Sequence, residues 1–275
     1  MLVHPNVLIS IRSMTMKEIN QTLELLNNRR TLRSYSSKKI ADEDKQKIIK
    51  AAMRAPTGSN MMMYSIIEVD DPEKKATLVK TCNNLHFIEK APLVLIFAAD
   101  MQRTYDYYEK SGAKEMVAEM GLEYERPLEG DLLVASCDAL IAAHTACIAA
   151  ESMGIGSCYI GDILEHTEVH REMFKLPRWV LPITMLVFGY PKRSNKPLHL
   201  SPRFDQKYIH FKNEYKQLSK EEFDDMYKDV QISNYRPGAI NLGQHFYMDF
   251  ISTVFVKEIN RSSKIMVDEW MKEED

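Results

Sequence analysis

Apolar residues recur with helical spacing in several stretches of the chain. The first stretch covers residues 16–28, and the second begins at Asp42 with acidic residues in its first turn and ends at Pro56. The longest covers residues 132–153 and is followed by Gly154, a natural helix C-cap. The spacing predicts further helices over residues 165–174, 219–228 and 244–272, the last as one long helix or a pair.

Four shorter segments have the composition of β-strands. They cover residues 64–69, 93–99, 157–160 and 183–189. The continuous apolar run at 93–99 is typical of a strand that is covered on both faces. Because helices separate these strands, the pattern favours an α/β or α+β sandwich with helices packed against a central sheet. Residues 105–130 are charged and rich in tyrosine, which fits either a mobile lid or a solvated helical excursion, and we prefer the excursion.

Composition narrows the class of protein. The chain has 275 residues, 45% of them hydrophobic, which is ordinary for a globular protein. A formal charge of -3 and a pI near 6.3 argue against nucleic acid as the main partner, because phosphate backbones require a basic surface. The start of the chain lacks the features of a signal peptide in their usual order.

The apolar stretch at residues 132–153 is interrupted by polar residues, so we expect a buried helix and not a membrane span. Within it, Cys137 and Cys147 are predicted to be small core residues and His144 a polar core residue. The four cysteines lack the spacing of metal ligands, and a reducing cytoplasm is the simplest setting for them.

Two segments carry groups that suit an anionic or flat ligand. Residues 29–33 read Arg-Arg-Thr-Leu-Arg, and forked guanidinium donors with a hydroxyl suit a phosphate or a polar ring edge. Cations that complement a helix C-terminus would explain the same residues. Residues 55–60 read Ala-Pro-Thr-Gly-Ser-Asn, where small residues admit a ligand near the backbone, although an ordinary turn has the same composition.

Two later segments add to these candidates. Residues 154–162 contain three glycines but follow a helix and open a strand, the reverse of the dinucleotide-binding order, so we reject a Rossmann interpretation. Lys196 and Arg203 follow the strand that ends at residues 189–191, where they suit a phosphate or serve only solubility. No segment pairs a nucleophile with a base or has metal-ligand spacing, so we predict neither a catalytic side chain nor a metal site.

Taken together and in this order, the four segments resemble the nitroreductase family of flavoproteins. Residues 29–33 match its Arg-Arg-Ser-x-Arg motif, and residues 55–64 match Ala-Pro-Ser-x-x-Asn-x-Gln-Pro-Trp. Residues 154–161 match Gly-x-Gly-x-x-Tyr-Ile-Gly, and residues 189–191 match the Gly-Tyr-Pro strand end that basic residues follow. The similarity covers residues 16–225.

The resemblance implies an α+β homodimer with a mostly antiparallel sheet and FMN shared between two subunits. Phosphate, ribityl and ring-edge contacts would come from Arg29, Arg30, Thr31 and Arg33. The partner subunit would supply Pro56, Thr57, Gly58 and Asn60, while Tyr159, Ile160 and Gly161 would lie over the ring. Lys196 and Arg203 would complete the phosphate site.

One position departs from the family pattern. Met62 stands where the family often has a glutamine that hydrogen-bonds the flavin. Because a thioether cannot donate a hydrogen bond, either a backbone group replaces that contact or the redox potential shifts.

The resemblance further implies a ping-pong reaction in which NADH or NADPH reduces FMN and a small acceptor, of the nitroaromatic or quinone type, then enters the same slot. Dehalogenation, flavin reduction and enoate reduction are alternatives within the fold, and a non-catalytic FMN-binding protein is an alternative outside it. The expected organisation is an extension at residues 1–15, an FMN-binding domain at 16–230 and a C-terminal helical extension at 231–275 that packs at the dimer interface.

Overall fold

A four-stranded antiparallel sheet forms the centre of the molecule. The computed structural model describes residues 20–192, 200–251 and 253–272. Its strands are β1 (Tyr64–Glu68), β2 (Leu93–Asp100), β3 (Gly156–Ile160) and β4 (Val180–Gly189). They lie in the order β1-β2-β4-β3, so β1 and β3 are the two edges of the sheet. All four predicted strands are present.

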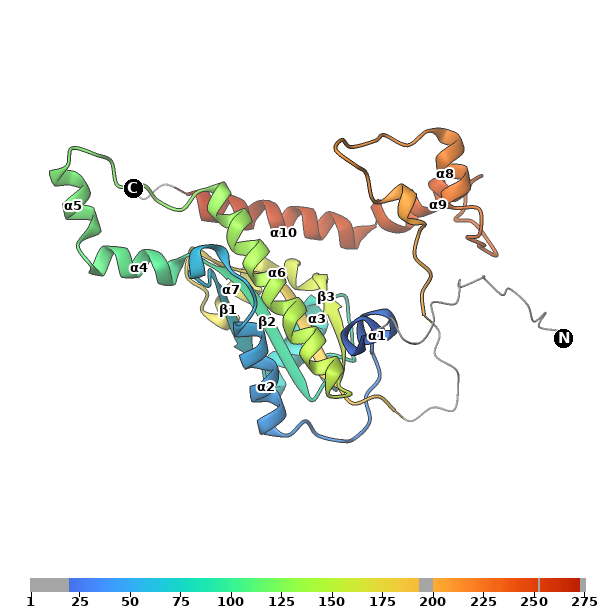
Figure 1. The fold of residues 1–275 in the computed structure, drawn as a ribbon, viewed down its shortest axis with the longest axis horizontal. Helices are drawn as coiled ribbons and strands as arrows, with labels where there is room; N and C mark the ends of the chain where they lie inside the picture. Colours follow the sequence, from blue (N-terminus) through green and yellow to red (C-terminus); the bar gives the residue numbers. More distant parts are fainter. Residues whose placement is uncertain (1–19, 193–199, 252, 273–275) are drawn as a thin grey trace.

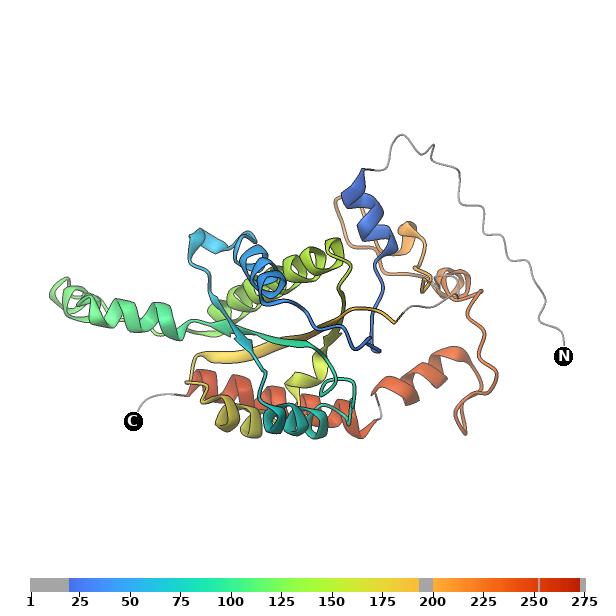
Figure 2. The ribbon, with the colours of Figure 1, turned by 90° about the horizontal axis from the view of Figure 1, so that it is seen from below.

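Helices cover both faces of the sheet, as the edge-on view in Figure 2 shows. On one face lie α2 (Asp42–Met53) and α6 (Glu129–Ser152), and on the other lie α3 (Pro72–Thr81), α7 (Thr167–Phe174) and α10 (Val254–Met271). The central strand β2 serves both layers: Leu93, Leu95 and Phe97 pack with the α2–α6 layer, and Val94 and Ile96 pack on the opposite side. This arrangement confirms the α+β class.

Alanine allows α6 to lie close to the sheet. Six alanines on its inner face are fully buried: Ala135, Ala139, Ala142, Ala143, Ala146 and Ala150. Among the described residues, α6 is the one helix whose length and apolar composition would also suit a membrane span. Its inner face packs against α2 and all four strands of the sheet, as the sequence predicted for a buried helix.

The prediction of burial is wrong for two residues of α6. Cys147 is buried as expected, but Cys137 and His144 are exposed on the outer face. Ten residues of helix turn the chain through roughly 1000°, so positions 137 and 147 point in different directions. The sequence does not reveal which side of the helix each residue is on, because α6 carries apolar residues on both its inner and its outer face.

The described part of the first helix is short. Helix α1 (Gln21–Asn28) begins at Asn20, whose side chain accepts a hydrogen bond from the N–H of Leu23, and the predicted start at residues 16–19 lies outside the described residues. Leu23 and Leu26, the predicted apolar stripe, are 47% and 44% exposed. These two side chains are therefore not buried by the described part of the chain.

Two segments project from the body of the molecule (Figure 1). Helices α4 (Gln102–Lys110) and α5 (Ala113–Glu119) form an arm beyond β2, which agrees with a helical excursion. Helices α8 (Lys220–Met226) and α9 (Leu242–Phe246) lie side by side at the other end, on both sides of the predicted boundary at residue 230.

Helix α10 returns to the body after this second projection. Its Trp270 is fully buried among Met101, Tyr105 and Trp179, and its indole N–H donates to the Leu128 carbonyl at 3.1 Å. The last helix therefore belongs to the core of its own chain, and of the predicted extension at residues 231–275 only the part around α9 lies in the projection.

We predict that Trp270→Ala destabilises the protein by about 3–5 kcal/mol, because it removes a large buried side chain and leaves a cavity. Chemical denaturation of the variant measures the loss. Val267→Ala, on the same helix but 39% exposed, is the control and should change the free energy of unfolding far less. Equal effects of both substitutions would show that α10 does not pack as described.

Candidate flavin site

The arginine-rich segment at residues 29–33 is held along the free edge of β3. The backbone N–H of Leu32 donates to the carbonyl of Ser157 at 2.8 Å, and Thr31 forms a parallel bridge with Ser157. Further along, the N–H of Ser36 donates to the carbonyl of Tyr190 at 2.9 Å, beyond the end of β4. Two backbone contacts therefore fix the direction in which the segment leaves α1.

Glycine makes this close approach possible. A Cβ atom at Gly156 would lie 2.7 Å from Cδ2 of Leu32, and one at Gly189 would collide with the ring of Tyr35. Any larger residue at either position would push the segment away from the sheet. Gly156 belongs to the glycine pattern noted in the sequence, and the structure shows that its role is packing.

The segment lines a cavity of about 880 Å³. Five predicted residues meet there, namely Arg29, Arg30, Thr31, Arg33 and Arg203. The structure adds Lys192 and Ser201, which the sequence analysis missed although Lys192 directly follows the Gly-Tyr-Pro strand end. None of the described lining residues is acidic. Lys196 lies outside the described residues.

Basic side chains supply the charge of the cavity lining, and acidic groups lie only behind it. Burial raises the pKa of Glu151, and the neighbouring Arg29 and Arg30 oppose that rise. Burial also raises the pKa of the Cys158 thiol, against the opposing effect of Arg33. A cavity lined by several guanidinium groups and an ammonium group is suited to a phosphate, which can accept hydrogen bonds from several donors at once.

The end of β3 stands beside this cavity-lining segment. Tyr159 is 37% exposed, Ile160 is buried, and Gly161 begins the short 3-10 helix η2 (Gly161–Leu164). A Cβ atom added at Gly161 would meet nothing within 4 Å, so the space over this backbone is open. The strand end therefore combines a partly exposed tyrosine with an accessible backbone at Gly161.

The predicted partner-facing residues form a loop at the other end of α6. Pro56 and Asn60 are exposed, while the Thr57 hydroxyl turns inward and donates to the buried carboxyl group of Asp138. The N–H of Gly58, in the short helix η1 (Gly58–Asn60), donates to the same carboxyl group at 3.2 Å. In the sequence, Asp138 is one of the polar residues that interrupt the apolar stretch at residues 132–153. A carboxyl group in an apolar helix is the signal that could have marked it.

Met62 does not offer a free backbone group in place of the missing glutamine. Its N–H donates to the Thr57 hydroxyl oxygen at 2.9 Å, and its carbonyl accepts from the N–H of Tyr64 at 2.7 Å. Its thioether packs against the core of the α2–α6 layer. Both backbone groups of Met62 are therefore engaged within the chain.

The two groups of residues are separated within one chain. The loop is bonded to α6 at Asp138, whereas the β3 edge meets α6 at Cys147, whose sulfur lies 3.1 Å from the Ser157 hydroxyl. With a rise of about 1.5 Å per residue, these two points are roughly 14 Å apart along the helix axis. The loop and the arginine cavity of one chain therefore do not form a single compact site.

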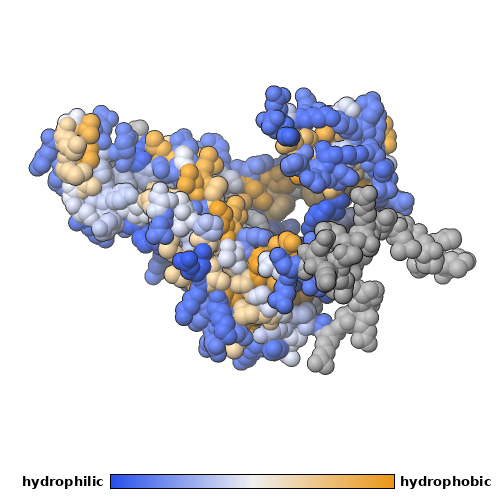
Figure 3. Space-filling model, in the orientation of Figure 1, coloured by the Kyte–Doolittle hydropathy of each residue, from blue (hydrophilic) through white to orange (hydrophobic). Residues whose placement is uncertain are grey.

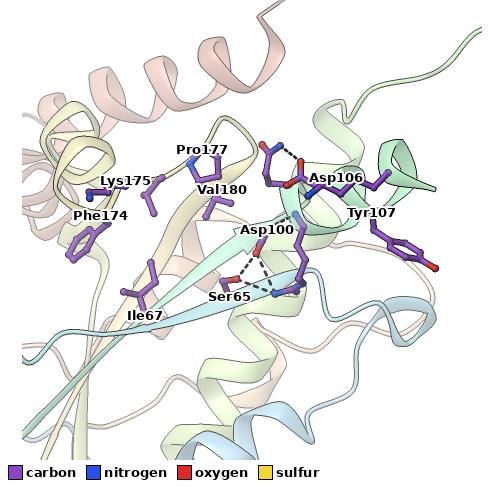
Figure 4. Close-up of a pocket in the computed structure, with 13 residues that line it drawn as sticks. Ser65, Ile67, Asp100, Asp106, Tyr107, Phe174, Lys175, Pro177 and Val180 are labelled. Atoms are coloured by element: carbon purple, nitrogen blue, oxygen red, sulfur yellow. Dashed lines mark hydrogen bonds and ion pairs between the residues drawn. The ribbon is translucent and has the colours of Figure 1, made fainter. Parts of the chain in front are cut away.

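A separate cavity of about 570 Å³ lies at the opposite edge of the sheet, between β1 and the loop before β4 (Figure 4). Its lining mixes charged and apolar side chains, among them Asp100, Arg103, Tyr107, Phe174 and Lys175. None of the predicted flavin-binding residues lines it. It is therefore distinct from the arginine cavity.

Comparison with known proteins agrees with this geometry. Residues 26–190 match the Nitroreductase family, which is more than half of the chain. The chain belongs to the nitroreductase family. The matched region contains the arginine segment, the 57–63 loop, the whole sheet and α6, and the expected resemblance and fold are confirmed.

Individual relatives in the nitroreductase family cover most of the chain. An enzyme of Bacillus subtilis named FMN reductase (NADPH) is 34% identical over 197 residues, which are 72% of this chain and 75% of that protein. An oxygen-insensitive NADPH nitroreductase of Salmonella typhimurium is 28% identical over 240 residues, 87% of this chain and 93% of that protein. The solved structure of B. megaterium NfrA2 superposes with a TM-score of 0.71 at 28% identity and covers 94% of this chain and all of that one.

The turn after Gly161 carries a buried acid in this nitroreductase. Glu165 is 5% exposed, and one of its carboxyl oxygens has no hydrogen-bond partner among the described residues. Burial, together with the nearby Asp162 and Glu258, raises the pKa of Glu165 to about 7.

We predict that Glu165→Gln stabilises the protein at pH 8 more than at pH 5. A folded-state pKa near 7, above the unfolded value, means that the native state gains stability from the protonated acid at low pH and loses it as pH rises through about 7. Glutamine remains uncharged throughout. Thermal unfolding at both pH values measures the difference, with the exposed Glu119→Gln as control. A shift that is the same at both pH values would contradict a raised pKa.

Proposed function

We propose that this nitroreductase binds FMN with its phosphate in the arginine cavity and moves electrons from NADH or NADPH to a small organic acceptor. The observation that carries the proposal is the convergence of Arg29, Arg30, Thr31, Arg33 and Arg203 on one cavity whose described lining contains no acidic side chain. Lys192 adds a fifth basic side chain to the four arginines. The names of the relatives, FMN reductase (NADPH) and NADPH nitroreductase, support the same cofactor class and make NADPH the first donor to test.

The residues that line the arginine cavity fit FMN. A volume of about 880 Å³ lies within the range of small-molecule sites, and the donor set suits a phosphate dianion. The open backbone at Gly161, with Tyr159 beside it, provides a surface on which a flat ring can rest. FMN supplies the electron transfer itself, through N5 of its ring, so the protein needs only to bind, orient and shield it.

We infer that the complete site needs two subunits. Helix α6 exposes an apolar stripe formed by Leu133, Val134, Leu140 and Ile141, which are 39–68% exposed. Figure 3 shows this stripe as apolar atoms along the middle of the molecule, where α6 faces the viewer in Figure 1. Exposed apolar stripes of this kind are typical of contact surfaces between subunits.

A two-fold axis across this stripe explains how the separated residues would meet. In a two-fold contact the same surface is used by both copies, so the Asp138 end of one α6 lies near the Cys147 end of the other. Pro56, Thr57, Gly58 and Asn60 of one chain then approach the arginine cavity of its partner. We therefore propose a homodimer with shared FMN sites, working in the cytoplasm, where the four free cysteines stay reduced.

We predict that Arg33→Ala weakens binding of FMN by about tenfold to a hundredfold and leaves binding of riboflavin almost unchanged, because riboflavin lacks the phosphate. Quenching of flavin fluorescence on titration of the apoprotein measures both affinities. Lys80→Ala, which removes an exposed positive charge from α3, is the control and should affect neither ligand. Equal losses for FMN and riboflavin would contradict a phosphate site in this cavity.

We predict that NADPH or NADH bleaches the flavin absorbance of the purified protein in stopped flow, and that a nitroaromatic or quinone added afterwards restores it. In a ping-pong cycle the donor leaves before the acceptor binds, so steady-state rates should give parallel double-reciprocal lines. Absence of bleaching with both donors would instead indicate a non-catalytic FMN-binding protein.

A further inference from the structure

A buried carboxyl group organises the loop that would reach the partner's flavin. Asp138 is 4% exposed, and it accepts hydrogen bonds from the Thr57 hydroxyl, from the N–H of Gly58 at 3.2 Å and from the N–H of Met63 at 3.2 Å. The Thr57 oxygen in turn accepts from the N–H of Met62. Removing a carboxyl group from water is costly, and these bonds offset that cost only while the loop keeps its shape.

The loop has a backbone that a free chain would avoid. Ser59, Asn60 and Met62 have φ values of 49°, 58° and 51°, in the left-handed region that non-glycine residues rarely adopt. Three such residues within four positions cost free energy and persist only where the surroundings impose them. Thr57, Gly58 and Met63, the residues bonded to Asp138, flank this strained part on both sides.

A second anchor holds the end of the loop where β1 begins. The Arg103 guanidinium donates to the carbonyl of Met62 and, at 3.0 Å, to that of Tyr64. Figure 4 shows the network beside it, in which Arg103 and Asp100 both contact the hydroxyl of Ser65. Arg103 lies in the first turn of α4, so this anchor comes from a different helix than Asp138.

We propose that Asp138 is a positioning residue for the flavin bound in the partner subunit. It holds residues 57–63 in their strained backbone conformation. The exposed Asn60, and Pro56 just before the loop, would then face the partner subunit across the α6 stripe. This inference rests on the proposed FMN function, and it assigns to Asp138 no contact with the cofactor itself. The loop and the arginine cavity contact α6 about 14 Å apart along its axis, so the flavin that the loop serves would be the one held by the partner.

Asp138→Asn is the variant that tests this role with little change in volume. An asparagine has one acceptor oxygen, so the N–H of either Gly58 or Met63 would face an amide NH₂ group and lose its partner. We expect FMN binding to weaken roughly tenfold. Unchanged affinity for FMN would overturn the proposal.

A general loss of stability must be separated from a loss of positioning. Leu78→Ala removes a fully buried side chain from α3, on the opposite face of the sheet, and touches neither the loop nor the cavity. Its melting temperature should fall at least as far as that of Asp138→Asn, while its FMN affinity below that temperature should match the unmodified protein. An equal loss of FMN affinity in Leu78→Ala would also overturn the proposal.

Mixed dimers decide whether Asp138 acts on the partner's flavin. Asp138→Asn chains and Arg33→Ala chains are unfolded together, refolded in equal amounts and titrated with FMN. A heterodimer has one site with an intact cavity and an intact loop, so random pairing should restore tight binding at about a quarter of the sites. No restoration would show that Asp138 supports the flavin of its own chain and would overturn the proposal.

The proposed function and the role of Asp138 are contradicted by different experimental results. Apoprotein without any substitution that does not bind FMN would contradict the function. Normal FMN binding by that protein, together with normal binding by Asp138→Asn, would contradict only the role of Asp138.

Discussion

Alanine side chains let α6 lie directly on the central sheet, and most other features of the molecule depend on this contact. Six fully buried alanines bring the helix close to β2 and β4, and the space that larger residues would need is absent. Helix α2 packs on one side of α6, the β3 edge meets it near Cys147, and the 57–63 loop is bonded to it at Asp138. A shift of α6 would therefore move both groups of candidate site residues, the loop bonded at Asp138 and the segment held near Cys147.

The same helix is apolar on its outer face. Leu133, Val134, Leu140 and Ile141 remain exposed, since the described part of the chain does not cover them. In the proposed dimer this face is buried, and it also explains why the candidate site is divided. A cavity that binds a phosphate and a loop that closes over a flat ring can lie at opposite ends of one helix, provided that a second copy brings them together.

The side chains of the candidate site suit binding of a cofactor, and the cofactor itself would carry the reaction. The cavity offers guanidinium, ammonium and hydroxyl groups, and none of the described lining residues is an acid that could repel a phosphate. Met62 contributes no free backbone group to this region, because its N–H and its carbonyl are both hydrogen-bonded within the chain.

The sequence by itself determined the elements and the order of the motifs. Apolar runs of strand length predicted all four strands. The motifs also predicted five residues that the structure brings to one cavity: Arg29, Arg30, Thr31, Arg33 and Arg203. These features depend on local spacing and residue type, which a sequence shows directly. The inner and outer faces of α6 cannot be distinguished in the same way, because both are apolar. The prediction that Cys137 and His144 lie on the inner face is therefore wrong. Only the tertiary structure decided that Asp138 organises the loop at residues 57–63, since the partners of a buried carboxyl group lie about 80 residues away in the chain and nothing local identifies them.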